Sequence, residues 1–444
     1  MSALGDAASV RGMSETTEFP PDRRFRRALW RTLRGASSVV RRLLIGERSL
    51  EPLGWQPGET ISADVVMHFP DAEAKLYQLT QWLPVLKELD KRHPVLILTR
   101  RKAAFVRLHE FTSLRKVYVP LFSQLSDLYT QNDFKVALYV NNGMRNFQSL
   151  AHQPMRHVHI NHGESDKVSM VSNQAKAYDR VFIAGEAARL RHRSALLDFD
   201  ESKLVAVGRP QLDLAPEPTI PPSDRRTVLY APTWEGESEA NNYTSVDVYG
   251  PAIVAAVLAM PNSRLIYKPH PRVPDSDNPP VAAGHTEIME QIDSAARSDP
   301  TAGHLVQLEG DVLAVIPRCD IVITDVSSVG LDFLYLKTEN PLFITDRRTD
   351  RTLLEREAPV SRCSYVIDQT TIGELATALP APLTDDSLRE ERQRMRRFYF
   401  GDGEPGDSTE RFIAAVDELV KERDALVARR LAMGQIHSYA PSDD

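Results

Sequence analysis

The sequence contains little cysteine: Cys319 and Cys363 are the only two among 444 residues. So few thiols exclude a disulfide-built scaffold and suit a reducing compartment. Cys319 adjoins an apolar run, so we expect a packed thiol there and not a ligand. No Cys/His cluster has metal-site spacing, and the Asp-x-Asp matches at 198–200 and 275–277 are expected by chance among 61 acids. We therefore expect no metal and no cofactor.

Long apolar runs and an excess of basic charge are also missing. No run approaches the ~20 residues that a membrane-spanning helix needs. Residues 1–22 are polar and lack the charged start and apolar core of a secretory signal. The net charge of −7 argues against general nucleic-acid binding, which needs a basic face. With 42% hydrophobic and 26% charged residues, the composition is that of a globular protein large enough for two domains.

The most informative segment that is present runs from Asp320 to Leu336. Ile321-Val322-Ile323 predicts a buried strand, because β-branched side chains pack well on a sheet. Ser327-Ser328 then stand at the N-cap position of a helix with an apolar pattern. The free N–H groups and positive dipole end of such a helix favour phosphate binding. An ordinary capped strand–helix turn is the alternative.

Further motifs follow the same order as in one known family. They are His162-Gly163 with Lys167, Tyr230-Ala231-Pro232-Thr233-Trp234, Lys268-Pro269-His270-Pro271, and a looser match at Asp402-Gly403 with Ser408 and Arg411. Together with 320–336 they resemble the CDP-glycerol glycerophosphotransferases, which include teichoic-acid primases and polymerases. The resemblance covers roughly residues 60 to 420.

The resemblance implies that an acceptor hydroxyl attacks the glycerol-bearing phosphorus of CDP-glycerol, or of a related CDP-polyol, and that CMP leaves. His162 is then the candidate base and His270 the candidate donor to the phosphates, because histidine exchanges protons near neutral pH. The expected donor-binding residues are Ser327, Ser328, Asp332, Thr233, Trp234 and Lys268. The weaker acceptor-side candidates are Gly163, Lys167, Asn142 and Arg145.

Each of these residues also has a structural interpretation. For His162 the alternative is a core histidine that is hydrogen-bonded to a neighbouring strand. Lys268 points away from the cleft if the alternation of side chains along the strand turns it to the other face of the sheet. Asp332 lies one helical turn after Ser328. It orients a hydroxyl of the donor substrate or Ser328 itself, and the alternative is a solvated acid. Asn142 and Arg145 fit a simple turn after a strand.

The chain departs from the family pattern in two places. Glu164-Ser165-Asp166 stand where the family usually has Thr-Pro-Leu, so we expect altered charge beside the reaction centre, and the identity of the acceptor stays open. In the family's G-x-P-R-x-D motif the arginine is replaced by Gln211, and Arg209 stands two positions earlier. No role is carried over to either residue.

Strand-like runs alternate with helical patterns, which predicts an α/β protein with parallel sheets. We expect strands at 64–69, 95–99, 116–119, 136–140, 158–160, 181–184, 227–230, 265–267, 320–324 and 341–344, and helices at 74–91, 311–318, 385–399 and 408–431. The predicted fold has two doubly wound Rossmann-like domains in the glycosyltransferase-B architecture. Its parts are an N-terminal acceptor-side domain 59–207, a linker 208–226, a C-terminal donor-nucleotide domain 227–383 and C-terminal helices 384–436.

The N-terminal extension is predicted to contain a disordered tail, 1–22, and a basic amphipathic helical segment, 23–58. Between Arg23 and Arg48 there are nine arginines and one acid, Glu47. An apolar stripe with Trp30 at its border is typical of a helix that lies on an anionic membrane. Docking onto the protein's own body is the alternative. We expect peripheral attachment to the cytoplasmic, inner face of the plasma membrane, where a lipid-linked acceptor lies.

Two other functions remain open from sequence alone. One is a nucleotide-sugar glycosyltransferase that uses the same phosphate turn to transfer a hexose. The other is a catalytically silent protein of an envelope-assembly complex, which the Glu164-Ser165-Asp166 departure would suit.

Overall fold

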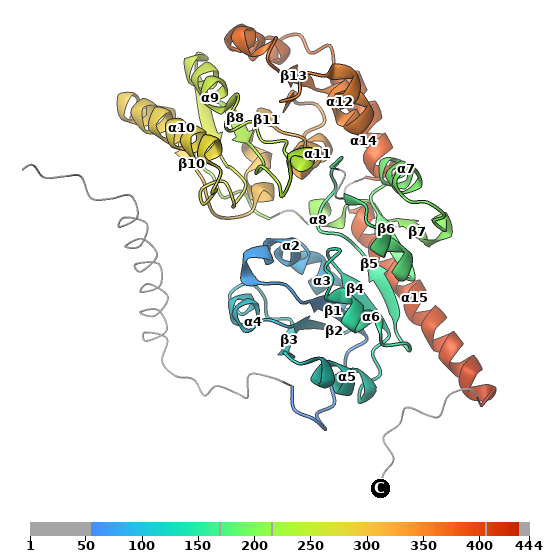
Figure 1. The fold of residues 1–444 in the computed structure, drawn as a ribbon. Helices are drawn as coiled ribbons and strands as arrows, with labels where there is room; N and C mark the ends of the chain where they lie inside the picture. Colours follow the sequence, from blue (N-terminus) through green and yellow to red (C-terminus); the bar gives the residue numbers. More distant parts are fainter. Residues whose placement is uncertain (1–54, 168–169, 215, 405, 435–444) are drawn as a thin grey trace, which may run out of the picture. The chain divides into compact units, whose positions relative to one another are not determined.

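The computed structural model describes residues 55–167, 170–214, 216–404 and 406–434, and every structural statement below refers to these ranges. Figure 1 shows their arrangement. The predicted tail 1–22 and the arginine-rich part of the segment 23–58 lie outside the described residues.

The first sheet has seven parallel strands in the order β3-β2-β1-β4-β5-β6-β7. Its strands are β1 (Val65–Phe69), β2 (Val95–Thr99), β3 (Arg115–Tyr118), β4 (Val136–Tyr139), β5 (Arg156–His159), β6 (Arg180–Ile183) and β7 (Leu204–Ala206). The strand order reverses between β1 and β4. In an open α/β sheet this reversal opens a crevice beyond the carboxyl ends of the strands, where ligands bind.

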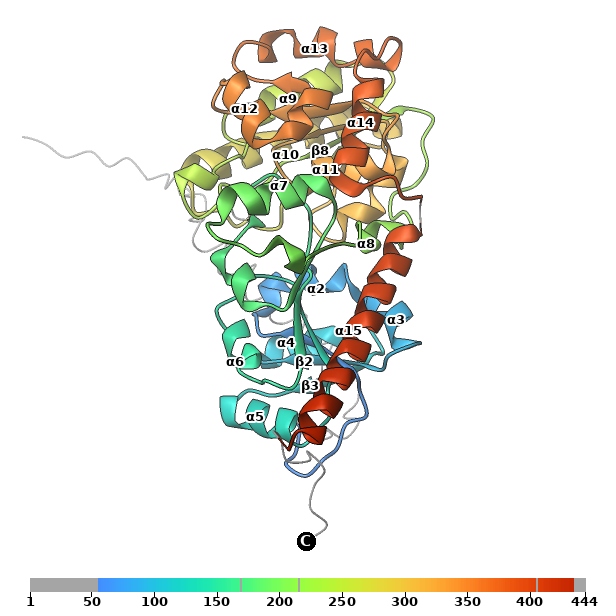
Figure 2. The same cartoon turned by 90° about the vertical axis from the view of Figure 1, so that its right-hand side faces the viewer.

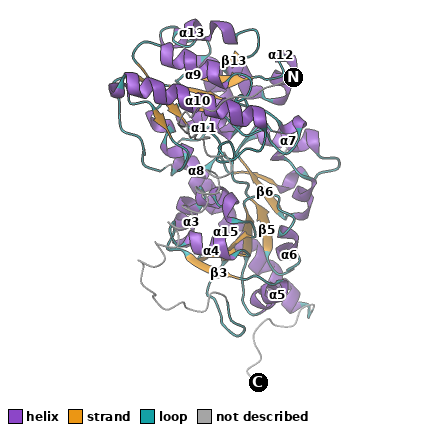
Figure 3. Cartoon of the chain, turned by 60° about the vertical axis from the view of Figure 1, so that its left-hand side comes forward, coloured by secondary structure: helices purple, strands orange, loops and turns teal. Residues whose placement is uncertain are grey.

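Helices cover both faces of the first sheet (Figure 3). They are α2 (Tyr77–Thr80), α3 (Leu83–Asp90), α4 (Lys102–Leu108), α5 (Phe122–Thr130), α6 (Asn146–Leu150) and α7 (Glu186–Ala195). Because side chains alternate along a strand, Val65 and Met67 of β1 pack in one apolar core and Val66 in another. This two-sided burial explains why the strands are nearly continuous apolar runs.

The second sheet has six parallel strands in the order β10-β9-β8-β11-β12-β13. They are β8 (Arg226–Ala231), β9 (Ser263–Tyr267), β10 (Leu305–Val306), β11 (Ile321–Thr324), β12 (Leu342–Thr345) and β13 (Tyr365–Ile367). The accompanying helices are α9 (Gly250–Ala259), α10 (Pro279–Ser298), α11 (Ser328–Leu336), α12 (Arg351–Glu357) and α13 (Leu375–Ala378). Two parallel sheets, each flanked by helices, confirm the predicted fold class.

The C-terminal helices connect the second sheet back to the first. α14 (Arg389–Phe400) packs Tyr399 and Phe400 into the same core as Leu331 of α11. α15 (Asp407–Ala432) then runs along the first sheet (Figure 2), where Phe412 and Val416 share a core with Val65. The predicted helix 408–431 therefore closes the fold on the first domain.

Some local predictions were wrong. The single helix expected at 74–91 is divided into a 3₁₀ turn (Glu73–Lys75), α2 and α3, because Pro84 lies in the first turn of α3 and cannot continue a preceding helix. The helix expected at 311–318 is two 3₁₀ turns, of which the second, Ile316–Arg318, contains Pro317. Within the predicted linker 208–226, a short helix α8 (Pro210–Asp213) is buried at Pro210, Gln211 and Leu212.

Candidate active site

The turn after β5 fixes the position of His162. Asn161 has a left-handed backbone with φ of 54°, a conformation that asparagine tolerates better than most residues. Its side-chain oxygen accepts a hydrogen bond from the backbone N–H of His162 at 2.8 Å, and its carbonyl accepts one from the Trp82 indole at 2.7 Å. These bonds hold the His162-Gly163 segment at the carboxyl edge of the sheet.

The hydrogen bonding of His162 selects one tautomer. Its Nδ1 lies 3.2 Å from the carbonyl oxygen of Val140, which can only accept, so Nδ1 carries the proton. Nε2 then presents a lone pair. Burial, and after it repulsion from Arg209, Lys75 and Lys167, lowers the pKa of His162 to about 4. The ring is therefore neutral near pH 7 and can accept a proton.

The hydrogen bonding of His270 selects the opposite tautomer. It lies between Pro269 and Pro271, and its backbone N–H donates to the Pro232 carbonyl at 2.9 Å. Its Nδ1 accepts a hydrogen bond from the backbone N–H of Arg272 at 3.2 Å, so the proton of the neutral ring is on Nε2. Burial, followed by the charges of Lys167 and Arg272, lowers its pKa to about 3. His270 is thus a hydrogen-bond donor, whereas His162 is an acceptor.

Tyr77 of α2 lies between the two histidines, which sequence reasoning did not anticipate. Its ring meets His162 edge-on at a centroid separation of 6.1 Å and His270 at 6.0 Å. His162 also contributes to the lowered pKa of His270. A histidine from each sheet is therefore brought to one place. The sequence offered no signal for Tyr77 beyond an aromatic residue after the first strand.

The capped turn predicted at the start of α11 forms as expected. Ser327 is the N-cap, and its Oγ accepts a hydrogen bond from Val329 N at 3.3 Å. Ser328 is the first helical residue. A Cβ placed on Gly163 would lie 3.5 Å from Ser328 Cβ, so the loop carrying His162 approaches the start of this helix.

A buried carboxylate supports the turn that contains Thr233. Asp325 accepts hydrogen bonds from Thr233 N and from Thr345 Oγ1, both at 2.6 Å. Thr233 Oγ1 in turn accepts one from Lys167 Nζ at 2.9 Å. Burial lowers the pKa of Lys167 to about 8, against the attraction of Asp325. Lys167, predicted on the acceptor side, therefore places its ammonium against the second sheet.

Asp332 is not a solvated acid. Its carboxylate accepts from Arg209 Nη2 at 3.1 Å, and the side chains of Asp332 and Arg209 are 2% and 4% exposed. Arg209 Nη1 also lies 3.4 Å from the carbonyl oxygen of His162. Asp332 thus holds an arginine beside the His162 loop, an arrangement that the G-R-P sequence gave no means to predict.

The remaining candidates lie at different places. The guanidinium of Arg272 lies 4.0 Å above the ring of Trp234, which stacks on His270. Lys268 Nζ donates to the carbonyl of Glu309 at 3.0 Å, so its ammonium is engaged within the second domain. Asn142 and Arg145 lie in the loop after β4, where Arg145 helps to lower the pKa of Arg100.

The departure from the family pattern does not leave free carboxylates at the reaction centre. Arg191 of α7 forms ion pairs with both Glu164 and Asp166, the latter at 2.9 Å. The hydroxyl of Tyr399 also donates to Asp166. The two carboxylates share the one guanidinium of Arg191, and burial raises the pKa of Asp166 to about 7, so altered charge beside His162 stays a prediction.

The fold is similar to that of several solved structures. A protein of Listeria monocytogenes that is provisionally assigned as a UDP-N-acetylglucosamine 2-epimerase matches with a TM-score of 0.53 and 13% identity, over 82% of this chain and 98% of that one. The wall teichoic acid polymerase TagF matches with a TM-score of 0.52 and 15% identity, over 89% of this chain and 98% of that one. A TagF variant soaked with CDPG matches with the same TM-score and 14% identity, over the same shares of the two chains. At these identities the likeness establishes the architecture alone.

No curated protein sequence matches the chain significantly. A family model does: that of CDP-glycerol:poly(glycerophosphate) glycerophosphotransferase matches residues 126–355, just over half of the chain. This range includes His162, His270 and the turn at Ser327-Ser328. The chain therefore belongs to the CDP-glycerol:poly(glycerophosphate) glycerophosphotransferase family and is a transferase of that class.

Proposed function

We propose that this enzyme transfers glycerol phosphate, or a related polyol phosphate, from CDP-glycerol to a hydroxyl of a lipid-linked or glycan acceptor, with release of CMP. The product belongs to a teichoic-acid-like or other cell-envelope polymer. The first domain, 59–207, supplies the acceptor side and the second, 227–383, the nucleotide side. The observation that carries this proposal is the opposite polarity of His162 and His270 around Tyr77.

In the proposed reaction the acceptor oxygen attacks the glycerol-bearing phosphorus. A new P–O bond forms, the P–O bond to CMP breaks, and the hydroxyl proton moves to Nε2 of His162. General-base catalysis of this kind contributes roughly two to four orders of magnitude. The neutral imidazole fixed by Val140 is in the correct tautomer for this step before substrate binds.

Charge on the leaving CMP is stabilised from the second domain. His270 donates from Nε2, and Ser328 and the N-terminal amides of α11 offer further donors. The ammonium of Lys167 adds positive charge beside Thr233. Donors that are fixed in place before reaction stabilise developing charge without a reorganisation cost.

Burial is the largest cause of the lowered pKa of both histidines, and the positive charge of Lys167 lowers both pKa values further. A bound diphosphate would oppose this effect of Lys167 and allow His162 to accept the hydroxyl proton as negative charge accumulates nearby.

Membrane attachment is proposed for the arginine-rich segment within 23–58, at the inner face of the plasma membrane. The support is its sequence: nine arginines and one acid between positions 23 and 48, in a chain whose net charge is −7. None of the helices in the described ranges is long and apolar enough to cross a bilayer.

A donor panel tests the proposed function. Purified enzyme is incubated with CDP-glycerol, CDP-ribitol, UDP-glucose and UDP-N-acetylglucosamine, and nucleotide release is measured with and without a lipid-linked acceptor. We expect CMP from a CDP-polyol and an increase when acceptor is added. Release of UDP from a UDP-sugar, with none from either CDP-polyol, would contradict the proposal and favour a glycosyltransferase.

A further inference from the structure

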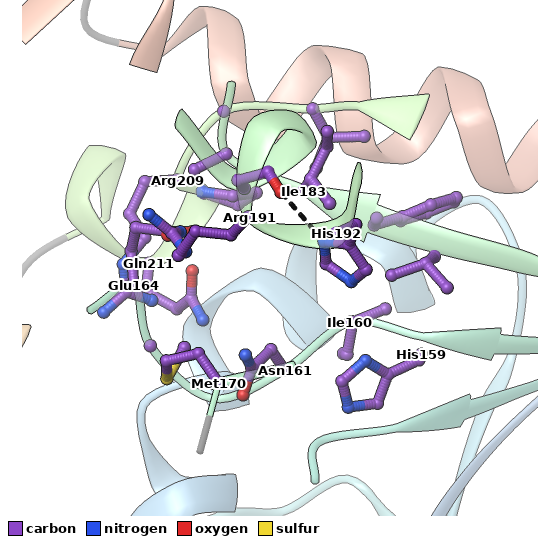
Figure 4. Close-up of a pocket in the computed structure, with 18 of the residues that line it drawn as sticks. His159, Ile160, Asn161, Glu164, Met170, Ile183, Arg191, His192, Arg209 and Gln211 are labelled. Carbon is purple, nitrogen blue, oxygen red and sulfur yellow. Dashed lines mark hydrogen bonds and ion pairs between the residues drawn. The ribbon is translucent and has the colours of Figure 1, made fainter. Parts of the chain in front are cut away.

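A pocket lies in the first domain, and its lining includes Gly163 and residues of β6 and α7. Figure 4 shows part of this lining. The cavity volume of the pocket is about 40 Å³, and the space that includes its open mouth is about 520 Å³. Side chains from β5, β6, α7 and α8 line it, and Gly163 and Arg209 belong both to its wall and to the surroundings of Ser328. The pocket therefore adjoins the proposed transfer site.

Both departures from the family pattern meet in this pocket. Glu164, from the Glu164-Ser165-Asp166 segment, and Gln211, which replaces the family's arginine, are lining residues. In Figure 4 they gather with Arg191 and Arg209 at one end, and His159 lies at the other. Two positions at which this chain differs from the family pattern therefore line one cavity.

Four buried polar atoms of the lining have no hydrogen-bond partner among the described residues. One is Oε1 of Glu164, which is ion-paired with Arg191. The other three are Nε2 of His159, Nε of Arg209 and Oε1 of Gln211, and these residues are only 4%, 3% and 2% exposed. Buried polar atoms are normally paired, so unpaired ones that line a cavity indicate a ligand or ordered water. Together these three offer a donor, an acceptor and a ring nitrogen that can serve as either, which is the requirement of hydroxyl groups.

The positive charges of the pocket are already paired. Arg191 pairs with Glu164 and with Asp166, and Arg209 pairs with Asp332 at 3.1 Å. Burial lowers the pKa of His159 to about 3, so its ring is neutral, and Gln211 carries no charge. Part of the lining is apolar, including Ile160, Val181 and Ala188. No unpaired cation of the lining remains to bind a phosphate.

We propose that this pocket is an acceptor subsite for a neutral, hydroxyl-bearing group, the end of a polyol, and that it discriminates against a phosphate. Gln211 is the residue that determines this preference, because an arginine at the same position would supply a free positive charge. The proposal rests on the proposed function, since it identifies the class of acceptor.

Saturation-transfer NMR with the full-length enzyme tests the assignment. The probes are glycerol, which is neutral, and glycerol 1-phosphate, each titrated into the wild-type protein, Gln211→Leu, Gln211→Arg and the control Gln291→Leu on α10. We expect the wild type and the control to bind glycerol more tightly than glycerol 1-phosphate. Gln211→Leu should weaken neutral binding about fivefold through loss of one hydrogen bond. Gln211→Arg should reverse the preference in favour of glycerol 1-phosphate.

Tighter binding of glycerol 1-phosphate to the wild type, no neutral binding at all, or neutral binding unchanged by both Gln211 variants would each overturn the proposal. Calorimetry with CDP-glycerol separates this failure from a failure of the proposed function. If every variant binds CDP-glycerol normally but the pocket results are negative, only the proposal of an acceptor subsite fails. If the wild type does not bind CDP-glycerol, the proposed function itself fails.

Discussion

Arg209 and Asp332 form a buried ion pair, with 3.1 Å between Nη2 and Oδ1, that joins the segment after β7 to the helix following the phosphate turn. Arg209 also reaches the carbonyl of His162. Through this pair, a residue of the predicted phosphate-binding helix fixes the loop that carries the proposed base. The pair is therefore expected to affect stability and catalysis together.

Replacement of one partner should be costly. Asp332→Asn leaves the Arg209 guanidinium buried without a counter-charge, a change that typically destabilises by about 3–5 kcal/mol. Urea denaturation followed by circular dichroism measures the loss. The surface pair of Arg297 and Asp293, both mostly exposed, provides the control: Asp293→Asn should change the free energy of unfolding by less than about 1 kcal/mol. Equal effects of the two substitutions would show that the buried pair is not structural.

The serines of the phosphate turn should contribute to donor affinity. Replacing Ser327 and Ser328 together by alanine removes charge-assisted hydrogen bonds to phosphate, and CDP-glycerol affinity should fall at least about tenfold. Ser327→Ala alone controls for the lost helix cap, since its Oγ is bonded to Val329 N. Calorimetry is the measurement. Donor affinity unchanged in the double variant would place the diphosphate elsewhere.

The rate should follow a bell-shaped pH profile. His162, with a pKa of about 4, accepts a proton only above that pH, so kcat/KM should fall as the pH decreases below it. Lys167, with a pKa of about 8, loses its charge as the pH rises, so kcat/KM should also fall above that value. Lys167→Arg keeps the charge and should move only the basic limb upward, because arginine stays protonated. A basic limb that Lys167→Arg leaves in place would assign it to another group.

Membrane attachment is tested by deletion of residues 1–48. Each basic residue near an anionic surface contributes about 1 kcal/mol, so the full-length protein should sediment with anionic liposomes at low salt and the truncated protein should not. The truncated enzyme should transfer slowly to a membrane-bound acceptor but retain turnover with a short water-soluble one. Full-length protein that stays in the supernatant would contradict the proposal.

Much of the fold could be predicted because its inner strands are short apolar runs between turn residues. The runs at 95–99 and 321–323 correspond to β2 and β11. The strands that were missed, β7, β10 and β13, are two or three residues long and lie at sheet edges. Their residues are apolar, but runs of two or three residues are too short to mark a strand, and most of these side chains are only partly buried.

The structure of the candidate site could be predicted where it depends on residues that are close in the sequence. Ser327 caps its helix as the sequence indicated, because capping depends on neighbouring residues only. Contacts between distant residues were not predictable. Three such contacts are those of Tyr77 with His162, of Arg209 with Asp332 and of Arg191 with Glu164. The partners lie tens to more than a hundred positions apart in the sequence, and no spacing rule relates them.

The two histidines give the most direct test of the central claim, that His162 is the base and His270 a donor to the phosphates. The measurement is the single-turnover rate of CMP release from CDP-glycerol with acceptor, together with CDP-glycerol affinity, for the wild type, His162→Ala and His270→Ala. For His162→Ala we predict a rate lower by roughly two to four orders of magnitude with little change in donor affinity, and for His270→Ala a loss of both. A His162→Ala enzyme that keeps its turnover rate, or that fails only because it binds CDP-glycerol weakly, would contradict the account.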